Sequence, residues 1–341
     1  MTLILSIAIV ITLLTSLVLA TRWRNVVCTG PMPASLFTFI AILFTSGLDV
    51  GLIMFPLVDF EVYATEAPYA FTNPLALEFG FWGFLVWGFY FLTTFYFCIV
   101  EPKLRLFEIP AIKFTNNIVI IGTCAFTGYL FLIYLPSYIP GISETFRYGL
   151  IAMVVLLAAA SSTHIRFVKI LSLSSTWLFF ALIAGIWLAS GMGIGGLGES
   201  LLNVGDYFAN LHQFVIPITD YHQFYLFWWF AWSIMIGQFV SRFVGGIKTW
   251  QLLAALLVVP SVPIAIWFSV LYYHFLNEVE ITGFWRLAMI VVGVTFVINS
   301  LDSLIRLYTQ NLDLTVDRFG TVPYVAGQVE ILRVQANQGV E

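Results

Sequence analysis

The chain has 341 residues, of which 60% are hydrophobic and only 9% are charged. This balance excludes a soluble globular domain, whose surface needs many more charged side chains. The net charge of −4 and the lack of a basic cluster give no indication of a nucleic-acid partner. The three cysteines are scattered through apolar stretches, so the sequence predicts no disulfide framework, no metal site and no cofactor.

Apolar runs long enough to cross a bilayer as helices recur along almost the whole chain. Backbone polar groups in lipid must be satisfied within the segment, and the long unbroken runs exclude a β-barrel. We therefore predict an all-α integral membrane protein. About nine transmembrane helices are expected, at residues 3–20, 35–56, 76–100, 116–136, 147–170, 175–192, 221–243, 250–274 and 284–308.

The basic residues between these spans predict the orientation of the chain. All of the 14 lysines and arginines except Arg147 and Arg286 fall on one side of the membrane when the spans alternate. Since that side should be cytoplasmic, we expect the N-terminus outside and the C-terminus inside a bacterial-type inner (plasma) membrane. The expected organisation is an N-terminal helix and loop at 1–34, a transmembrane core at 35–311 and a polar cytoplasmic tail at 312–341.

Two of the expected spans carry aromatic residues in their interior, although interfacial tryptophan normally lies near the ends of a span. The six residues on these spans, 76–100 and 221–243, are Trp82, Trp87, Tyr90, Trp228, Trp229 and Trp232. At about 100° per residue, each trio occupies one broad helix face. Aromatic faces can hold a quaternary ammonium group, which has no N–H to donate, with about 0.5–2 kcal/mol per contact. We expect the two helices to face each other around an organic cation; for any single tryptophan, packing or an interfacial belt is the alternative.

Asp49 is the other unusual residue, because it lies near the middle of the second expected span. A carboxylate at that depth is costly and marks a functional hypothesis, and Gly47 and Gly51 permit an unwound segment around it. Asp49 could be a counter-charge for a cationic substrate or a proton or cation site; a structural hydrogen bond is the alternative. Asp302 and Arg306, near the cytoplasmic end of the last span, are expected to be a snorkelling pair. The sequence contains no nucleotide, metal or nucleophile motif, so we do not expect an enzyme.

Four motifs then follow one another in an order typical of one transporter family: Trp82-x4-Trp87-x2-Tyr90, Trp228-Trp229-x2-Trp232-Ser233, Val259-Pro260-x6-Trp267-Phe268-Ser269 and Thr295-Phe296-x-Ile298-Asn299-Ser300. Over about residues 36–311 the sequence resembles the betaine/carnitine/choline transporter (BCCT) family. The resemblance implies an amino-acid/betaine transporter-like inverted-repeat fold with the substrate near the membrane midplane. It implies that Trp82, Trp87, Tyr90 and Trp229 form an aromatic box around the substrate. It also implies that Trp228 and Trp232 line the pathway nearby.

The chain also departs from the family pattern. Gly47-Leu48-Asp49-Val50-Gly51 stands where the family has Gly-Met-Gly-Ile-Gly, and Asn299 and Ser300 stand where it has a sodium-site threonine and serine. We take Asp49, Asn299 and Ser300 as candidate ion-coupling residues, with Na+ or H+ as the ion. The family has twelve spans, so we expect a shortened member that lacks the last two helices and has an incomplete inverted repeat.

These observations predict a permease for a quaternary ammonium compound of the choline, betaine or carnitine type. Choline-like cations are preferred over zwitterionic betaine, because Asp49 would repel a carboxylate placed beside it. The alternative is a reduced paralogue that binds without transporting, as a quaternary ammonium sensor or as a subunit of a membrane complex. The expected partners are the solute, the lipid bilayer, and either further copies in a homotrimer or a membrane partner subunit.

Overall fold

The computed structural model describes residues 2–48, 50–139 and 141–338, so Asp49 lies outside the described residues. Within them, eight helices are long and apolar enough to cross a membrane, which confirms the prediction of an all-α multi-pass membrane protein. They are α1 (Thr2–Arg22), the broken segment Pro74–Leu104, α8 (Pro110–Tyr138), α9 (Glu144–Ser161), α10 (Ile165–Ala189), α13 (Asp220–Val240), α14 (Thr249–Leu276) and α15 (Gly283–Asn311). A shorter apolar helix, α2 (Leu36–Gly47), occupies most of the second predicted span.

The second predicted span is divided in the structure. After α2 the chain is extended at Leu48, then forms α3 (Val50–Met54) and α4 (Pro56–Thr65). The break leaves helical carbonyl groups without their usual N–H partners. Ser300 on α15 donates its hydroxyl hydrogen to the carbonyl of Leu48 at 2.8 Å, with the carbonyl of Thr45 also within reach at 3.4 Å. A neighbouring helix therefore stabilises the break.

The third predicted span is also broken, into α5 (Pro74–Trp82) and α6 (Leu85–Phe95), followed by a π-helical turn (Tyr96–Val100) and α7 (Glu101–Leu104). Phe84 lies between α5 and α6 with φ of 33°, a conformation that non-glycine residues rarely adopt. Its N–H donates to the hydroxyl oxygen of Ser261 at 2.8 Å, and the N–H of Leu85 donates to that of Tyr207 at 3.3 Å. These bonds to side chains of other elements replace the missing helical ones.

The predicted boundary between the fifth and sixth spans is wrong, because the structure ends α9 at Ser161 and starts α10 at Ile165. The polar run Ser161-Ser162-Thr163-His164 marks this turn, and the prediction did not use it. Arg306 stabilises the turn, because its guanidinium donates to the carbonyl groups of Ser161 and His164 at 3.0 and 3.3 Å. Arg306 and Asp302 form the expected pair, at 3.0 Å, but the expectation that they snorkel is wrong, since both are buried.

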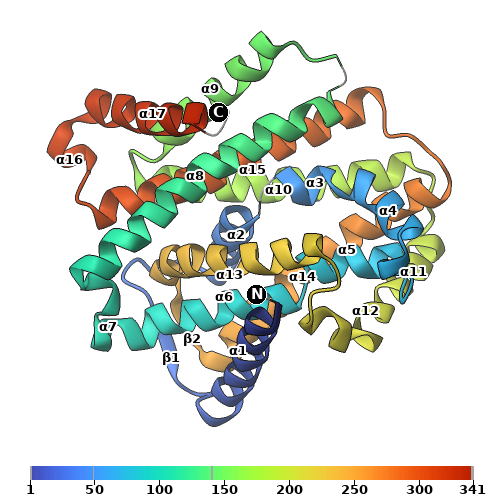
Figure 1. Cartoon of the computed structure of the whole chain (residues 1–341), viewed down its shortest axis with the longest axis horizontal. Coiled ribbons are helices and arrows are strands. Elements are labelled where there is room, and N and C mark those ends of the chain that lie inside the picture. Colours follow the sequence, from blue (N-terminus) through green and yellow to red (C-terminus); the bar gives the residue numbers. More distant parts are fainter. Residues whose placement is uncertain (1, 49, 140, 339–341) are drawn as a thin grey trace.

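Figure 1 shows α6 and α13 running beside each other through the middle of the molecule, with α8 and α15 beside each other across its upper part. α10 packs between α2 and α15, and α1 lies against α6 and α14. The remaining helices are short or peripheral: α11 (Ile194–Asn203), α12 (Gly205–Ala209), α16 (Val316–Phe319) and α17 (Thr321–Gln338), the last packed on α8 and α9. The candidate site lies between α5, α8 and α13.

One small sheet joins distant parts of the chain. β1 (Val27–Thr29), which follows α1, pairs antiparallel with β2 (Gly245–Lys248), which precedes α14. Gly30 continues this contact, since its N–H donates to the carbonyl of Val244 at 2.9 Å. A Cβ at Gly30 would lie 2.2 Å from the backbone oxygen of Ser241, so only glycine fits there. The loop after α1 is therefore tied to the end of α13.

Candidate substrate-binding site

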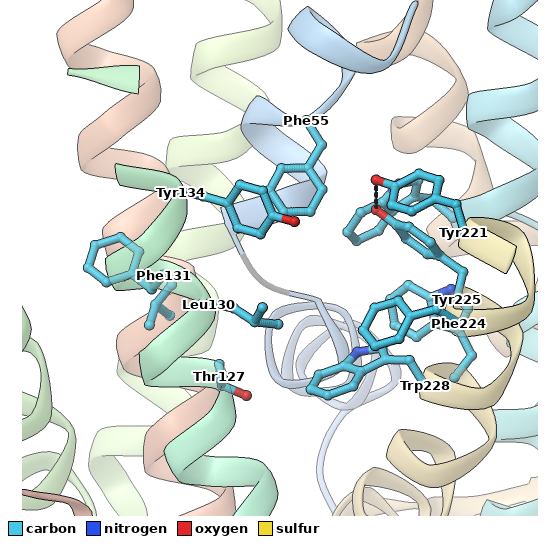
Figure 2. Close-up of a pocket in the computed structure, with 12 residues that line it drawn as sticks. Phe55, Thr127, Leu130, Phe131, Tyr134, Tyr221, Phe224, Tyr225 and Trp228 are labelled. Atoms are coloured by element: carbon cyan, nitrogen blue, oxygen red, sulfur yellow. Dashed lines mark hydrogen bonds between the residues drawn. The ribbon is translucent and has the colours of Figure 1, made fainter. Parts of the chain in front are cut away.

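A cavity of about 200 Å³ opens between α8 and α13, and its lining is mostly aromatic. Figure 2 shows Thr127, Leu130 and Tyr134 on α8 on one side, with Tyr221, Phe224, Tyr225 and Trp228 on α13 on the other. Phe55, at the junction of α3 and α4, covers one end, and its ring lies 4.9 Å from that of Tyr134. None of the 12 described residues that line the cavity is charged. Small-molecule sites commonly have such apolar, concave walls.

Trp82 and Trp229 meet at the wall of this cavity. Their rings are 5.3 Å apart at an interplanar angle of 73°, and Tyr225 lies 5.7 Å from Trp82. The helix break between α5 and α6 positions Trp229. Because the N–H of Leu85 bonds to Tyr207, the carbonyl of Phe81 is free of its helical partner and accepts the indole N–H of Trp229 at 2.8 Å. Trp82 and Trp229 therefore come together in a fixed edge-to-face pair, as the two aromatic clusters suggested.

Trp87 and Tyr90 lie behind this pair and do not line the cavity. Both are fully buried, with rings 5.0 Å apart, and Tyr90 lies 6.4 Å from Trp229. The hydroxyl of Tyr90 donates to the carbonyl of Gly47 at 3.1 Å, which ties α6 to the end of α2. A Cβ at Gly47 would lie 3.3 Å from the Tyr90 ring, so the small residue permits the close approach. These two residues support the broken helices.

Of the two remaining candidate tryptophans, one lines the cavity and the other lies behind it. Trp228 lines the cavity, stacked at 6.2 Å on Phe224. Trp232 is buried one turn further along α13 and stacks on Trp228 with rings 5.1 Å apart. Within the described lining residues, only Trp82, Trp228 and Trp229 of the six predicted aromatic residues reach the cavity.

Sequence reasoning missed the tyrosines of the cavity. Tyr221, Tyr225 and Trp229 are spaced four residues apart and so share one face of α13. This spacing could have identified the two tyrosines, but the prediction considered only the tryptophans of this helix. The α8 wall, with Thr127 and Tyr134, carries no comparable signal. Its place opposite α13 follows only from the packing of the whole chain.

The candidate ion-coupling residues lie at the other helix break. Asn299 and Ser300 are fully buried on α15, and the Asn299 amide donates to the hydroxyl oxygens of Thr45 and Ser172. Carbonyl and hydroxyl oxygens of α2 and α15 therefore gather at Leu48, and such oxygens are the usual ligands of hard cations. Asp49, the third candidate, is outside the described residues.

Comparison with known proteins gives a consistent assignment. Residues 121–272 match the family model described as BCCT, betaine/carnitine/choline family transporter. The glycine betaine transporter OpuD of Bacillus subtilis is 23% identical over 281 residues, which are 69% of this chain and 54% of that protein. An uncharacterized transporter of Haemophilus influenzae is 28% identical over 279 residues, covering 69% of this chain and 42% of that protein.

A glycine betaine transporter of Acinetobacter baylyi is 20% identical over 336 residues, covering 78% of this chain and 50% of that protein. The chain thus spans about half the length of the curated relatives it matches. The matched family consists of transporters rather than enzymes. With its membrane-spanning helices and the order of its aromatic motifs, this chain is similar to the betaine/carnitine/choline transporter family.

Proposed function

We propose that the chain binds a quaternary ammonium compound in the aromatic cavity and carries it across the membrane as a secondary-transporter-like permease. One observation supports this most directly: Trp82 and Trp229 form an edge-to-face pair at the wall of an uncharged cavity, with Tyr225 beside them. A methylated ammonium group is weakly hydrated and needs no hydrogen-bond acceptor. It therefore gains more from ring faces than a primary amine would.

The expected affinity follows from the number of rings. Each cation–π contact is worth about 0.5–2 kcal/mol, and more where water is excluded. Three or four contacts then give a dissociation constant in the micromolar to millimolar range. Choline-like cations are the preferred substrates in this proposal, since Asp49 would oppose the carboxylate of betaine or carnitine. Two of the curated relatives are named glycine betaine transporters, so betaine is the natural competitor.

The two helix breaks support transport rather than binding alone. Discontinuous helices at substrate depth allow one group of helices to tilt against another around the bound solute. Here the breaks fall at Leu48 and at Gly83–Phe84, and Tyr90 on α6 bonds to Gly47 beside the first of them. In this proposal the N-terminus faces outwards and the C-terminus faces the cytoplasm of a bacterial cell. Asn299 and Ser300, with Asp49, are the proposed ion-coupling residues.

Tryptophan fluorescence with choline, betaine and carnitine at millimolar concentration tests the binding step. We expect a saturable change in the purified protein that Trp229→Phe weakens. Trp177→Phe is the matched control, because Trp177 lies exposed on α10, with Phe37 and Phe180 as its ring contacts. A protein that gives no change with any of the three solutes contradicts the proposal.

Uptake of radiolabelled choline into cells without other permeases tests the transport step. Accumulation that Trp229→Phe reduces and Trp177→Phe preserves supports a permease. Binding without accumulation supports the alternative, a quaternary ammonium sensor or a subunit that completes its fold with another chain. Repeating the uptake with and without sodium identifies whether Na+ is the coupling ion.

A further inference from the structure

Two carboxylic acids outside the predicted site, Asp59 and Glu78, are buried close enough to interact electrostatically. Asp59 lies on α4 with 9% of its surface exposed, and Glu78 lies on α5 with none exposed. Among the described residues, neither forms an ion pair with a lysine, arginine or histidine. Two negative charges cannot both persist in such a place, because burial and mutual repulsion each disfavour ionisation.

The polar groups around the two acids come from three elements. Tyr63 on α4 and Trp82 on α5 face Glu78, and Tyr63 also faces Asp59. Tyr221 on α13 donates its hydroxyl hydrogen to Asp59 at 3.4 Å. Tyr69, in the 3-10 turn after α4, and Tyr225 on α13 complete the set of titratable neighbours. α14 also packs on α4 and α5, but its titratable side chains are not among the groups that interact with the two acids.

Among the described residues, Glu78 has no cationic partner, and the donors that face it are neutral. Within the part of the chain that the structure describes, neither of its carboxyl oxygens makes a hydrogen bond of standard geometry. The hydroxyl of Tyr63 and the indole N–H of Trp82, which face it, are likewise without a standard partner. Two buried donors thus face one carboxyl group, and its complete burial favours the neutral, protonated acid over a fixed anion.

Asp59 connects this acid pair to the aromatic cavity. The hydroxyl of Tyr221 contacts Asp59 and also the hydroxyl of Tyr225 at 3.3 Å, the bond drawn in Figure 2. Tyr221, Tyr225 and Trp82 all line the cavity. Burial raises the pKa of the Asp59 carboxyl to about 7, with the nearby hydroxyl groups of Tyr221 and Tyr63 acting in the opposite direction. Asp59 can therefore exchange its proton near neutral pH.

We propose that Asp59 and Glu78 form a proton-binding site and that a cation entering the aromatic cavity displaces its proton. The second half of this proposal rests on the proposed function. A positive charge beside Tyr221 and Tyr225 stabilises the ionised form of Asp59, so the carboxyl O–H bond breaks and the proton leaves to water. By reciprocity, protonation of the pair weakens cation binding by the same factor. Proton release on one side and capture on the other would make H+ the counter-ion of transport.

The proton site can be tested without any substrate. Infrared difference spectra of the full chain in lipid vesicles, recorded across neutral pH, should show the carbonyl stretch of a protonated carboxylic acid disappearing as the pH rises through about 7. Asp59→Asn should remove this titrating signal, and Glu78→Gln should alter it. Glu61→Gln, which changes an exposed acid on the same helix, should leave it intact. If the wild type, Asp59→Asn and Glu78→Gln all give the same titration, the proposed proton-binding site is wrong.

The linkage is tested by adding choline chloride to weakly buffered protein with a pH indicator. We expect proton release together with binding, and an affinity for choline that tightens with pH by at most about tenfold per unit. Asp59→Asn should bind choline with little pH dependence and without this release. Binding by the wild type with no proton release overturns the linkage but leaves the proposed function standing. A titrating Asp59 signal in a protein that binds no choline, betaine or carnitine instead overturns the proposed function and leaves the proton site.

Discussion

Two buried acidic sites among the described residues differ in whether a cationic side chain accompanies the acid. Asp302 on α15 is paired with Arg306 at 3.0 Å, and the guanidinium also caps the turn between α9 and α10. Asp59 and Glu78 have tyrosines and a tryptophan around them but no cationic partner among the described residues. A counter-charge offsets much of the cost of keeping a buried acid ionised, so that the acid can hold helices together as part of an ion pair. Its absence makes the acid a group that gains and loses a proton.

Removal of the counter-charge should have the largest effect. Arg306→Met leaves Asp302 without its counter-charge and removes the hydrogen bonds to the turn between α9 and α10, so we expect a loss of about 3–5 kcal/mol in stability. Thermal unfolding in detergent measures it. The double variant with Asp302→Leu should recover most of the loss, because a pair replaced by apolar groups leaves no buried charge. A single variant as stable as the wild type would show that the pair has no structural role.

The next largest effect should be the pH dependence of stability, which we expect to come from the ionisation of Asp59. Its pKa is about 7 in the folded chain against an ordinary value of 3.8, so the folded state binds more protons between these values. Stability should be highest below about pH 4 and fall by no more than about 4 kcal/mol as the pH rises through 7. Asp59→Asn should flatten this profile, whereas Glu61→Gln should not. Unfolding temperatures across the pH range provide the measurement, and a profile that rises with pH contradicts the assignment.

Trp229→Phe should have an intermediate effect on the cavity that adjoins the acid pair. The change removes the hydrogen bond to the Phe81 carbonyl and part of the cation–π surface. We expect choline binding to weaken by roughly 3- to 30-fold, which corresponds to about 0.5–2 kcal/mol. Isothermal titration calorimetry measures the change, and Trp177→Phe should match the wild type. Equal weakening in both variants would place the effect in general folding.

Tyr221→Phe should have the smallest effect, a shift in the pKa of Asp59. It tests directly how the neighbours of an acid without a counter-charge set its protonation. The Tyr221 hydroxyl lowers the pKa of Asp59, so its loss should move the titration to higher pH. A single hydrogen bond is worth about 0.5–1.5 kcal/mol, which corresponds to about one pH unit or less. Infrared titration detects the shift. A midpoint that moves to lower pH would mean that the hydroxyl does not stabilise the ionised carboxylate.

The fold was largely predictable from sequence, because long apolar runs leave a chain in lipid few alternatives to helices. The Trp82–Trp229 pair was predictable for a related reason: large rings in the interior of two spans are conspicuous. The helix break at Phe84 was not, since its backbone conformation depends on Ser261 and Tyr207 from distant elements. The acid pair was equally hidden. In the sequence, Asp59 lies in an acidic segment between two predicted spans and Glu78 lies at the start of the second of them. Only the packing of α4 on α5 buries the two acids together.

The small sheet between β1 and β2 has a mechanical consequence. It fastens the segment that follows α1 to the link between α13 and α14, with backbone contact at Gly30 too tight for any other residue. Any tilting of α13 must therefore pull on the C-terminal end of α1. Trp23, half exposed at that end, is a natural attachment point for a spectroscopic label. Such a label would follow any motion of α13 from outside the cavity, without altering any residue that lines it.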